Sequence, residues 1–177
     1  GDTSGPFDLC ITDSDGRDGP GDDPEVHVTV AFSWFGEVGP YAGWKGSDAV
    51  VQALSGTAFS FGAPEGPPIV AQGFGPSIIA GVTGLIAGLA ALIGRGPESA
   101  PVRVDVNVLE AALCITETAA IGAAGGGLQS RRLGVNRFFP TYPASAYETA
   151  EGWVGVTALT PAQWRALSAL LGLGDGV

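Results

Sequence analysis

Two stretches of this 177-residue sequence carry the side chains that could do chemistry. The first, "FGEVGPYAGWKGSDAVVQALSG" (35–56), begins with Gly-Pro turn residues, ends as a helix and contains Lys45. The second, "GPSIIAG" (75–81), contains Ser77 at the start of a Gly- and Ala-rich segment. By itself, Lys45 is equally well explained as a solvated lysine at a helix start, and a serine hydroxyl without a neighbouring base is a poor nucleophile. Residue types alone therefore leave open whether these stretches form a working catalytic site.

The only histidine and the two cysteines are weaker candidates. His27 falls in an expected strand with no acid spaced to activate it, and a lone histidine in a strand is more often structural than catalytic. Cys10 and Cys114 have neither metal-ligand nor redox spacing. This favours two buried, reduced thiols in a cytoplasmic protein over a disulfide.

Sequence motifs of four common site types are absent. The sequence has no GxSxG elbow, no Walker A motif, no CxxC pair and no HExxH motif, and it predicts no metal site. The segment "GAAGGG" (122–127) resembles a phosphate-binding loop, but it follows an expected helix instead of opening one. Its amides would lack a helix dipole behind them, so a loop at a helix end is the favoured interpretation.

The overall charge limits the class of partner. The net charge is −10 and the isoelectric point is about 4.2, which argues against nucleic acid or an anionic membrane as a partner. A local basic pocket for a phosphate-bearing small molecule is still possible. With 45% hydrophobic and 15% charged residues, the chain can bury a core. The acidic, polar start "GDTSGPFDLC" does not predict a signal peptide, and we expect a cytoplasmic location.

One apolar stretch could in principle cross a membrane. Residues 66–94 contain no charged side chain and are long enough to span a bilayer. The stretch opens with prolines, however, and is rich in Gly and Ala, and its flanks offer neither an aromatic belt nor a basic cluster. We therefore expect residues 76–94 to form a helix buried in a protein core.

Strands alternate with helices along the chain, which predicts an α/β fold. The N-cap residues Ser47 and Thr160 support two of the helices, and Gln163 completes a capping box with Thr160. An acidic, Gly-rich loop is expected over residues 12–25. The expected strands are 7–11, 26–35, 102–108 and 152–159, and the expected helices are 47–56, 76–94, 109–124 and 160–172.

Six segments in a fixed order carry a resemblance to a known family. Taken together over about residues 28–172, they resemble the family III CoA-transferases, a group that includes formyl-CoA and carnitine CoA-transferases and the related alpha-methylacyl-CoA racemases. No single motif is decisive, but chance does not readily produce all six in this order. The segments are "GPYAGWKGSDAVVQALSG", "GAPEGPPIV", the Gly/Ala helix, "VRVDVNVLEAAL", "GVNRFFPTYPAS" and "GWVGVTALTPAQWRALSALLG".

The resemblance implies a fold and a domain organisation. It implies a Rossmann-like large domain and a small α/β domain in two intertwined subunits. Family members are roughly twice this long, so the chain resembles the middle of one. We expect an acidic linker or loop at 1–25, part of the large domain at 26–130, and a linker with the start of the small domain at 131–177.

The resemblance also implies the chemistry. Family members use an aspartate whose carboxylate attacks the acyl-CoA thioester and forms a mixed anhydride. That aspartate stands three residues before an Ala-Gly pair, which here places Ser77 at its position. A serine would form an ordinary ester of lower transfer potential. The racemase histidine position falls on Ser47, and Lys45 matches a lysine that lies near the CoA phosphates or the active site.

Two aspartates are candidate substitutes for the missing one. Asp48 is best explained as an acid interacting with the dipole of its own helix, and Asp105 as a structural residue of a strand. The sequence therefore predicts a degenerate half of a family III CoA-transferase without its own nucleophile, with catalysis elsewhere in a homo- or hetero-oligomer that contains an intact family III subunit. Coenzyme A or acyl-CoA would be the substrate or ligand, with no covalently bound cofactor. A non-catalytic CoA-binding or scaffold subunit is the alternative, and a racemase-like enzyme is a weaker one.

Overall fold

The computed structural model describes residues 7–13, 26–96, 98–127, 131–134 and 141–173. Its larger part is built on a three-stranded parallel sheet of order β1-β2-β3. The strands are β1 (Leu9–Asp13), β2 (Val28–Ser33) and β3 (Val102–Asn107). Parallel strands with helices between them confirm the predicted α/β class. An acidic loop was expected over 12–25, but residues 12 and 13 belong to β1, so its predicted start is wrong; residues 14–25 lie outside the described residues.

The central strand carries the core. Four consecutive residues of β2, from Val28 to Ala31, are buried, as expected for a parallel strand covered on both faces. Val28 and Val30 cluster with Val51 of α1, Ala80 of α2 and residues of β3 and α3. The β-branched run "VTVAFS" therefore forms the strand and supplies the hydrophobic centre.

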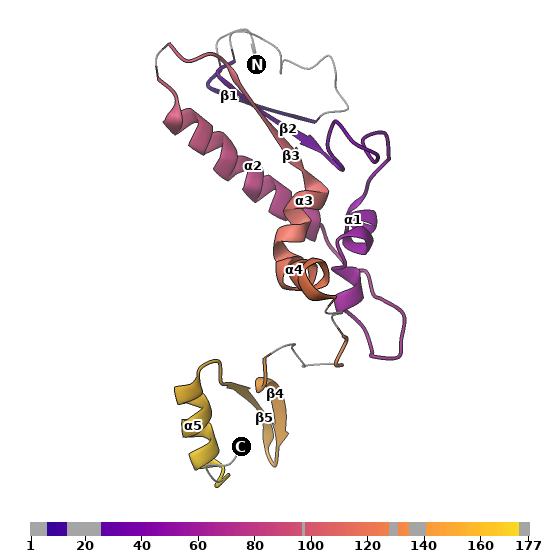
Figure 1. Ribbon diagram of the computed structural model, residues 1–177, viewed down its shortest axis with the longest axis vertical. Helices are drawn as coiled ribbons and strands as arrows, with labels where there is room; N and C mark the ends of the chain where they lie inside the picture. Colours follow the sequence, from indigo (N-terminus) through magenta and orange to yellow (C-terminus); the bar gives the residue numbers. More distant parts are fainter. Residues whose placement is uncertain (1–6, 14–25, 97, 128–130, 135–140, 174–177) are drawn as a thin grey trace.

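Helix α2 (Gly75–Gly94) runs along the sheet (Figure 1) and packs against it through small residues. A Cβ atom added to Gly84 would lie 2.3 Å from Phe32 Cζ, and one added to Gly88 would lie 2.9 Å from Val30 Cγ2. These glycines let the helix backbone approach the side chains of β2 closely. The predicted helix at 76–94 is confirmed, but its complete burial is wrong, because only the face that carries Ala80, Gly84 and Gly88 is buried.

Among the described helices, α2 is the one that is long and apolar enough to cross a membrane, judged by length and composition only. One bent pair of helices also reaches the required length and hydropathy, but only if the pair is counted as a single span. Within the most apolar window of α2, 17% of the residues are buried inside the protein. Its outer face exposes a row of large apolar side chains to solvent. These are Ile78, Val82, Leu85, Ile86, Leu89 and Ile93.

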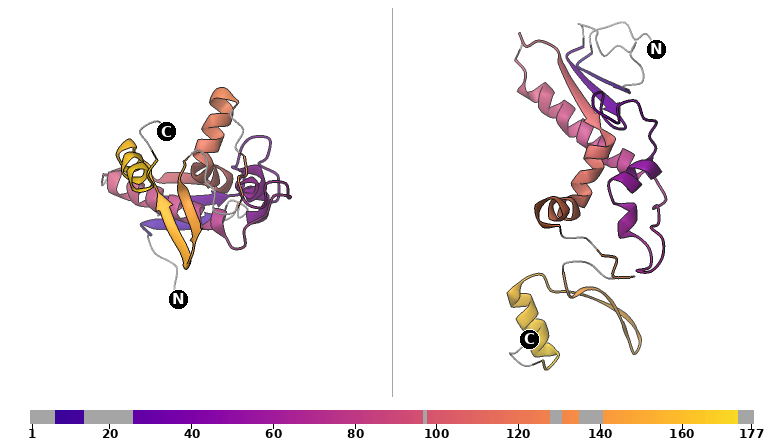
Figure 2. Two further views of the ribbon diagram at one scale, coloured as in Figure 1. Left: turned by 90° about the horizontal axis from the view of Figure 1, so that it is seen from below. Right: turned by 45° about the vertical axis from the view of Figure 1, so that its right-hand side comes forward.

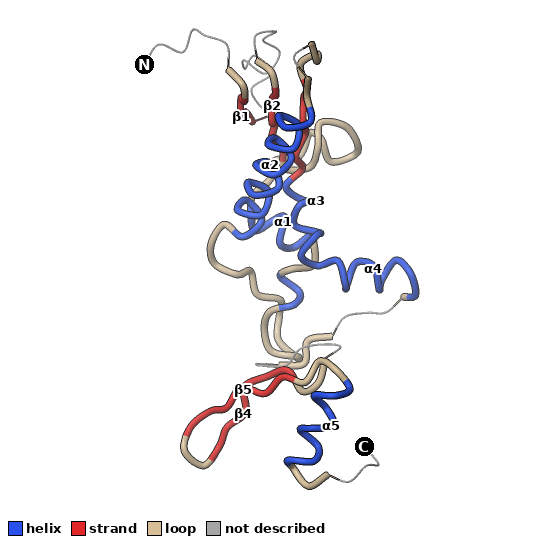
Figure 3. Tube along the Cα trace, turned by 90° about the vertical axis from the view of Figure 1, so that its left-hand side faces the viewer, coloured by secondary structure: helices blue, strands red, loops and turns tan. Residues whose placement is uncertain are grey.

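The remaining helices of this part lie at the ends of the strands. Helix α1 (Asp48–Leu54) follows β2, and α3 (Val108–Leu113) follows β3. A single helix over 109–124 was predicted, and this is wrong. A 3-10 turn, Cys114–Thr116, separates α3 from α4 (Glu117–Gly126), which points away from α3 (Figure 3). The Thr116 hydroxyl lies at this break, where its one hydrogen is shared between the carbonyls of Ser55 at 3.1 Å and Leu113 at 3.3 Å.

The C-terminal part is a hairpin followed by a helix, set apart from the parallel sheet (Figure 2). Strands β4 (Ala144–Thr149) and β5 (Gly152–Thr157) pair antiparallel, and α5 (Pro161–Leu170) follows. The capping box is confirmed, since Thr160 Oγ1 accepts from Gln163 N at 3.2 Å and Gln163 Oε1 accepts from Thr160 N at 3.0 Å. The sequence did not predict β4. The expected domain boundaries after residues 25 and 130 stay predictions.

Candidate functional site

A pocket of about 430 Å³ lies where the parallel strands end. Its walls come from the last residues of β1 and β2, from the start of α3 and from the first two turns of α2. In open parallel sheets this carboxyl edge is the usual place for ligands. The lining residues are Asp13, Phe32, Ser33, Trp34, Ser77, Ala80, Gly81 and Val108.

Ser77 is half-buried in the first turn of α2 and lines this pocket. Its hydroxyl donates a hydrogen bond to Asp48 Oδ2 at 2.8 Å, and its backbone N–H donates to Asp48 Oδ1 at 3.0 Å. Asp48 begins α1, so one carboxylate joins the N-terminal turns of two helices. It satisfies an N–H of α2 that has no partner within the helix.

Sequence reasoning missed this pair. The sequence assigns Asp48 to the dipole of its own helix and predicts no base beside Ser77, whereas the structure places the Asp48 carboxylate there. The two residues are 29 positions apart, and no local pattern reports on such a contact. The signal nearest to this contact is the adjacency of Asp48 to Ser47, the position that the resemblance matches to the racemase histidine.

Ser47 itself has a structural task in this chain. Its hydroxyl accepts a hydrogen bond from Val50 N at 3.4 Å and caps α1, as its sequence position predicted. The side chain is exposed and is not part of the pocket lining. A capping hydroxyl of this kind is not equipped to abstract a proton from carbon.

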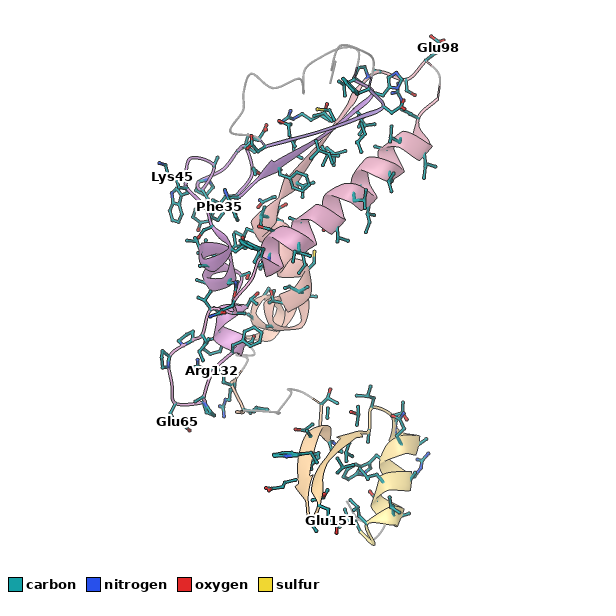
Figure 4. The ribbon with its side chains drawn as sticks, turned by 180° about the vertical axis from the view of Figure 1, so that it is seen from behind. Phe35, Lys45, Glu65, Glu98, Arg132 and Glu151 are labelled. Atoms are coloured by element: carbon teal, nitrogen blue, oxygen red, sulfur yellow. The ribbon has the colours of Figure 1, made fainter. Side chains whose placement is uncertain are left out.

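Lys45 is exposed in the loop between β2 and α1 (Figure 4) and is not among the residues that line the pocket. The neighbouring Gly46, however, packs directly on the pocket wall. A Cβ atom on Gly46 would lie 2.1 Å from Trp34 Cγ, so this loop and the wall residue Trp34 are in close contact. The loop that carries Lys45 therefore contacts the wall residue Trp34, while Lys45 itself is exposed and does not line the pocket.

Aromatic rings stabilise the same loop. The ring centroids of Tyr41 and Trp44 are 4.7 Å apart, and Phe35 meets each of them edge-on at 6.4 and 6.3 Å. Phe35 is buried, whereas Tyr41 and Trp44 are exposed. The buried ring therefore anchors a loop whose outer aromatic side chains face solvent next to Lys45.

A buried amide positions the segment that leads into α2. Gln52 is 2% exposed, its Nε2 donates to the carbonyl of Ala71 at 3.2 Å, and its Oε1 accepts from Ala71 N at 2.9 Å. These two hydrogen bonds hold the backbone of Ala71 in place, shortly before Ser77 in the chain. Buried amide groups need such partners.

The other sequence candidates lie outside the pocket. Asp105 accepts a hydrogen bond from Arg103 Nε at 2.9 Å, and Arg103 also pairs with Glu37. Burial lowers the pKa of Arg103, but the two carboxylates outweigh this effect, and its pKa is raised above its usual value. His27 Nδ1 lies 3.3 Å from Asp8 Oδ1 at the far end of β2. Asp105 and His27 thus lie outside the pocket with charged partners, and the sequence did not predict the acid beside His27.

The cysteines are free, as predicted, but the expectation that both are buried is wrong. Cys10 is half-buried and Cys114 is exposed, because the break after α3 places Cys114 on a 3-10 turn instead of inside a helix. The loop 122–127 ends α4, with Gly127 in the left-handed conformation of a helix C-cap. Within the described residues no group of three or more His, Cys, Asp or Glu side chains could hold a metal ion.

Comparison with known proteins agrees with this architecture. The profile of the family described as CoA-transferase family III matches residues 24–177. A succinate–glutarate CoA-transferase from Agrobacterium fabrum is 29% identical over 147 residues, which cover 83% of this chain and 36% of that protein. An acetyl-CoA:oxalate CoA-transferase from Acetobacter aceti is 31% identical over 108 residues, which cover 60% of this chain and 28% of that protein.

Solved structures share the fold. A CaiB/BaiF family protein from Brucella suis superimposes with a TM-score of 0.71 at 24% identity, covering 95% of this chain and 47% of the other. A hypothetical protein from Mycobacterium tuberculosis gives a TM-score of 0.73 at 23% identity, covering 95% and 46%. The chain thus spans about a third to half of the length of these proteins. With the family profile matching nearly all of it, the chain belongs to CoA-transferase family III.

Proposed function

We propose that this chain forms part of a CoA-transferase that moves CoA between acyl groups, and that Ser77 is not the residue that carries the acyl group. The observation that carries the proposal is the place of Ser77 on the wall of the pocket at the sheet edge, at the position that the resemblance assigns to the nucleophilic aspartate. Acyl-CoA would bind with its thioester in this pocket and its phosphates towards Lys45. The chain is degenerate at position 77, because a serine ester would not return an acyl group to a thiol.

Acyl-CoA binding is tested by filling the pocket. Gly81 lines the pocket, and a Cβ atom added there meets nothing within 4 Å, so Gly81→Leu projects its side chain into free space. We expect at least a roughly tenfold loss of affinity for acetyl-CoA or succinyl-CoA by calorimetry, equivalent to about 1.4 kcal/mol. Thr83→Leu on the exposed side of the same helix is the control and should bind as wild type. Equal affinities of the two variants would refute binding in this pocket.

A non-catalytic subunit that keeps the CoA pocket is the alternative function. The exposed Lys45 and the exposed rings of Tyr41 and Trp44 favour it, since they offer a charge and stacking surfaces without any reactive group. A racemase-like activity has less support, because Ser47 is engaged as a helix cap. CoA exchange by the wild-type chain would exclude the non-catalytic alternative.

The apolar outer face of α2 supports an assembly with a second family III subunit. Its side chains are roughly half exposed or more, and contiguous apolar surface of this kind marks an interface. We expect a homo- or hetero-oligomer in the cytoplasm, with the outer face of α2 covered. Light scattering at micromolar concentrations checks this, and a wild-type chain that stays a monodisperse monomer would contradict it. The paired substitution Val82→Lys and Ile86→Lys should shift the assembly to smaller species.

A further inference from the structure

One carboxylate remains in contact with the position of the missing aspartate. Asp48 places Oδ2 2.8 Å from Ser77 Oγ, and its other oxygen is held by the N–H of the same residue. The carboxylate comes from α1 instead of α2, but it lies one hydrogen bond behind the pocket wall. We propose that Asp48 is the catalytic nucleophile of this chain and that Ser77 only orients it. This inference rests on the proposed function and names the acyl-carrying group of the same site.

The geometry gives Ser77 and Asp48 different roles in the proposed reaction. Ser77 lines the pocket, so its hydroxyl is the first polar group that a bound thioester meets. Its side chain is a single rotor, so a turn about the Cα–Cβ bond would break its hydrogen bond to Asp48 Oδ2 and free that oxygen to attack a thioester bound beside Ser77. The backbone bond from Ser77 N to Asp48 Oδ1 does not depend on that rotation, so it keeps the carboxylate in place. Asp48 is only partly buried, so an acyl group on Oδ2 would not have to fit inside the core.

The step balances without any further reagent. Asp48 Oδ2 forms a bond to the thioester carbonyl carbon, and the C–S bond breaks with its electron pair leaving on the sulfur of CoA as a thiolate. The product is a mixed anhydride, which stays activated towards thiols as the transfer cycle requires. The thiolate can then attack the Asp48 side-chain carbon, which releases the donor acid as a carboxylate and leaves an aspartyl–CoA thioester for the acceptor.

Asp13 is the rival carboxylate, because it lines the same pocket from the end of β1. Asp48 is favoured for one reason: it is the carboxylate that touches Ser77, whose position the resemblance identifies with the nucleophile. The two assignments predict acylation of different peptides.

The test locates the covalent adduct. The full chain is incubated with acetyl-CoA or succinyl-CoA, quenched with hydroxylamine, digested and sequenced by mass spectrometry. The aspartyl–CoA thioester becomes an aspartyl hydroxamate, and so does the part of the mixed anhydride that hydroxylamine attacks at the aspartyl carbon, whereas an ester on Ser77 is seen as an acylated serine when hydroxylamine is omitted. We expect the hydroxamate at Asp48. Acylation of Ser77 or a hydroxamate at Asp13 would each overturn the proposal.

Two variants give a second readout. Asp48→Asn keeps the shape and an oxygen for the Ser77 N–H, so we expect a similar thermal midpoint but CoA exchange reduced on the order of a thousandfold. Ser77→Ala keeps the carboxylate and the backbone bond, so exchange should stay within roughly tenfold of wild type. The reverse pattern would make Ser77 the nucleophile and Asp48 its proton acceptor, and it would overturn the proposal.

Calorimetry of the wild-type chain with acyl-CoA distinguishes a failure of the Asp48 assignment from a failure of the proposed function. If wild type binds acyl-CoA but forms no adduct at Asp48, the Asp48 assignment fails and the pocket proposal stands. If wild type does not bind acyl-CoA at all, the proposed function fails and the Asp48 assignment falls with it. The adduct position in wild type is informative even if Asp48→Asn does not fold.

Discussion

Replacing Gly84 with alanine is expected to lower the free energy of unfolding by about 2 kcal/mol, although alanine is the better helix former. The new Cβ atom would lie 2.3 Å from Cζ and 2.9 Å from Cε1 of Phe32, and 3.2 Å from a methyl carbon of Val30. Both neighbours belong to the central strand: the ring of Phe32 packs against the core and must move, and Val30 is 1% exposed, so relief of the overlap disturbs the packing between α2 and β2. Chemical denaturation followed by far-UV circular dichroism measures the change.

Gly81→Ala is the matched control on the same helix. No atom lies within 4 Å of a Cβ atom at Gly81, so this variant keeps the gain in helix propensity, up to about 1 kcal/mol, without any steric cost. The difference between the two variants therefore isolates the contact between α2 and β2. If both substitutions stabilise the chain equally, the close approach of Gly84 to β2 is refuted.

Local signals allowed much of the fold to be predicted. Ser47 and Thr160 cap their helices through contacts three residues along the chain, and the sequence shows such contacts directly. The same holds for β2, whose β-branched run is long and uninterrupted. Cues of this kind depend on near neighbours only, and this is why three helices and the strands of the sheet were found close to their correct positions.

Elements that depend on competing or distant contacts were missed. The helix predicted over 109–124 breaks at Thr116, whose hydroxyl hydrogen is shared between the carbonyls of Leu113 and the distant Ser55. Strand β4 (Ala144–Thr149) has no strong alternation of its own and is defined by pairing with β5. Propensity is weak in such segments, and tertiary context decides them.

The resemblance named candidate site residues, but it did not predict their arrangement. The resemblance led to Ser77, Ser47 and Lys45, and the structure places Ser77 on the pocket wall, Ser47 at a helix cap and Lys45 outside the pocket lining. The carboxylate beside Ser77 was not foreseen, because it depends on how α1 and α2 meet. Helix-to-helix geometry of this kind is not encoded in the spacing of either segment.

Gly46→Ala is expected to open or distort the pocket with little effect on the core. A Cβ atom there would lie 2.1 Å from Cγ, 2.4 Å from Cβ and 2.5 Å from Cδ2 of Trp34. These atoms are at the root of the side chain, so turning the end of the ring does not relieve the overlap. Either Trp34 leaves its rotamer or the loop that carries Lys45 moves away. Both outcomes change the wall opposite Ser77.

We therefore expect affinity for acetyl-CoA or succinyl-CoA to fall at least roughly tenfold, with altered tryptophan fluorescence but a smaller loss of stability than in Gly84→Ala. Trp34 is partly exposed at the edge of the core, which limits the effect of its displacement on folding. Gly43→Ala is the control in the same loop, because no atom lies within 4 Å of its added Cβ atom. Should both variants bind acyl-CoA as wild type does, Trp34 is not a wall of the functional pocket, and the ligand must enter the site without contacting it.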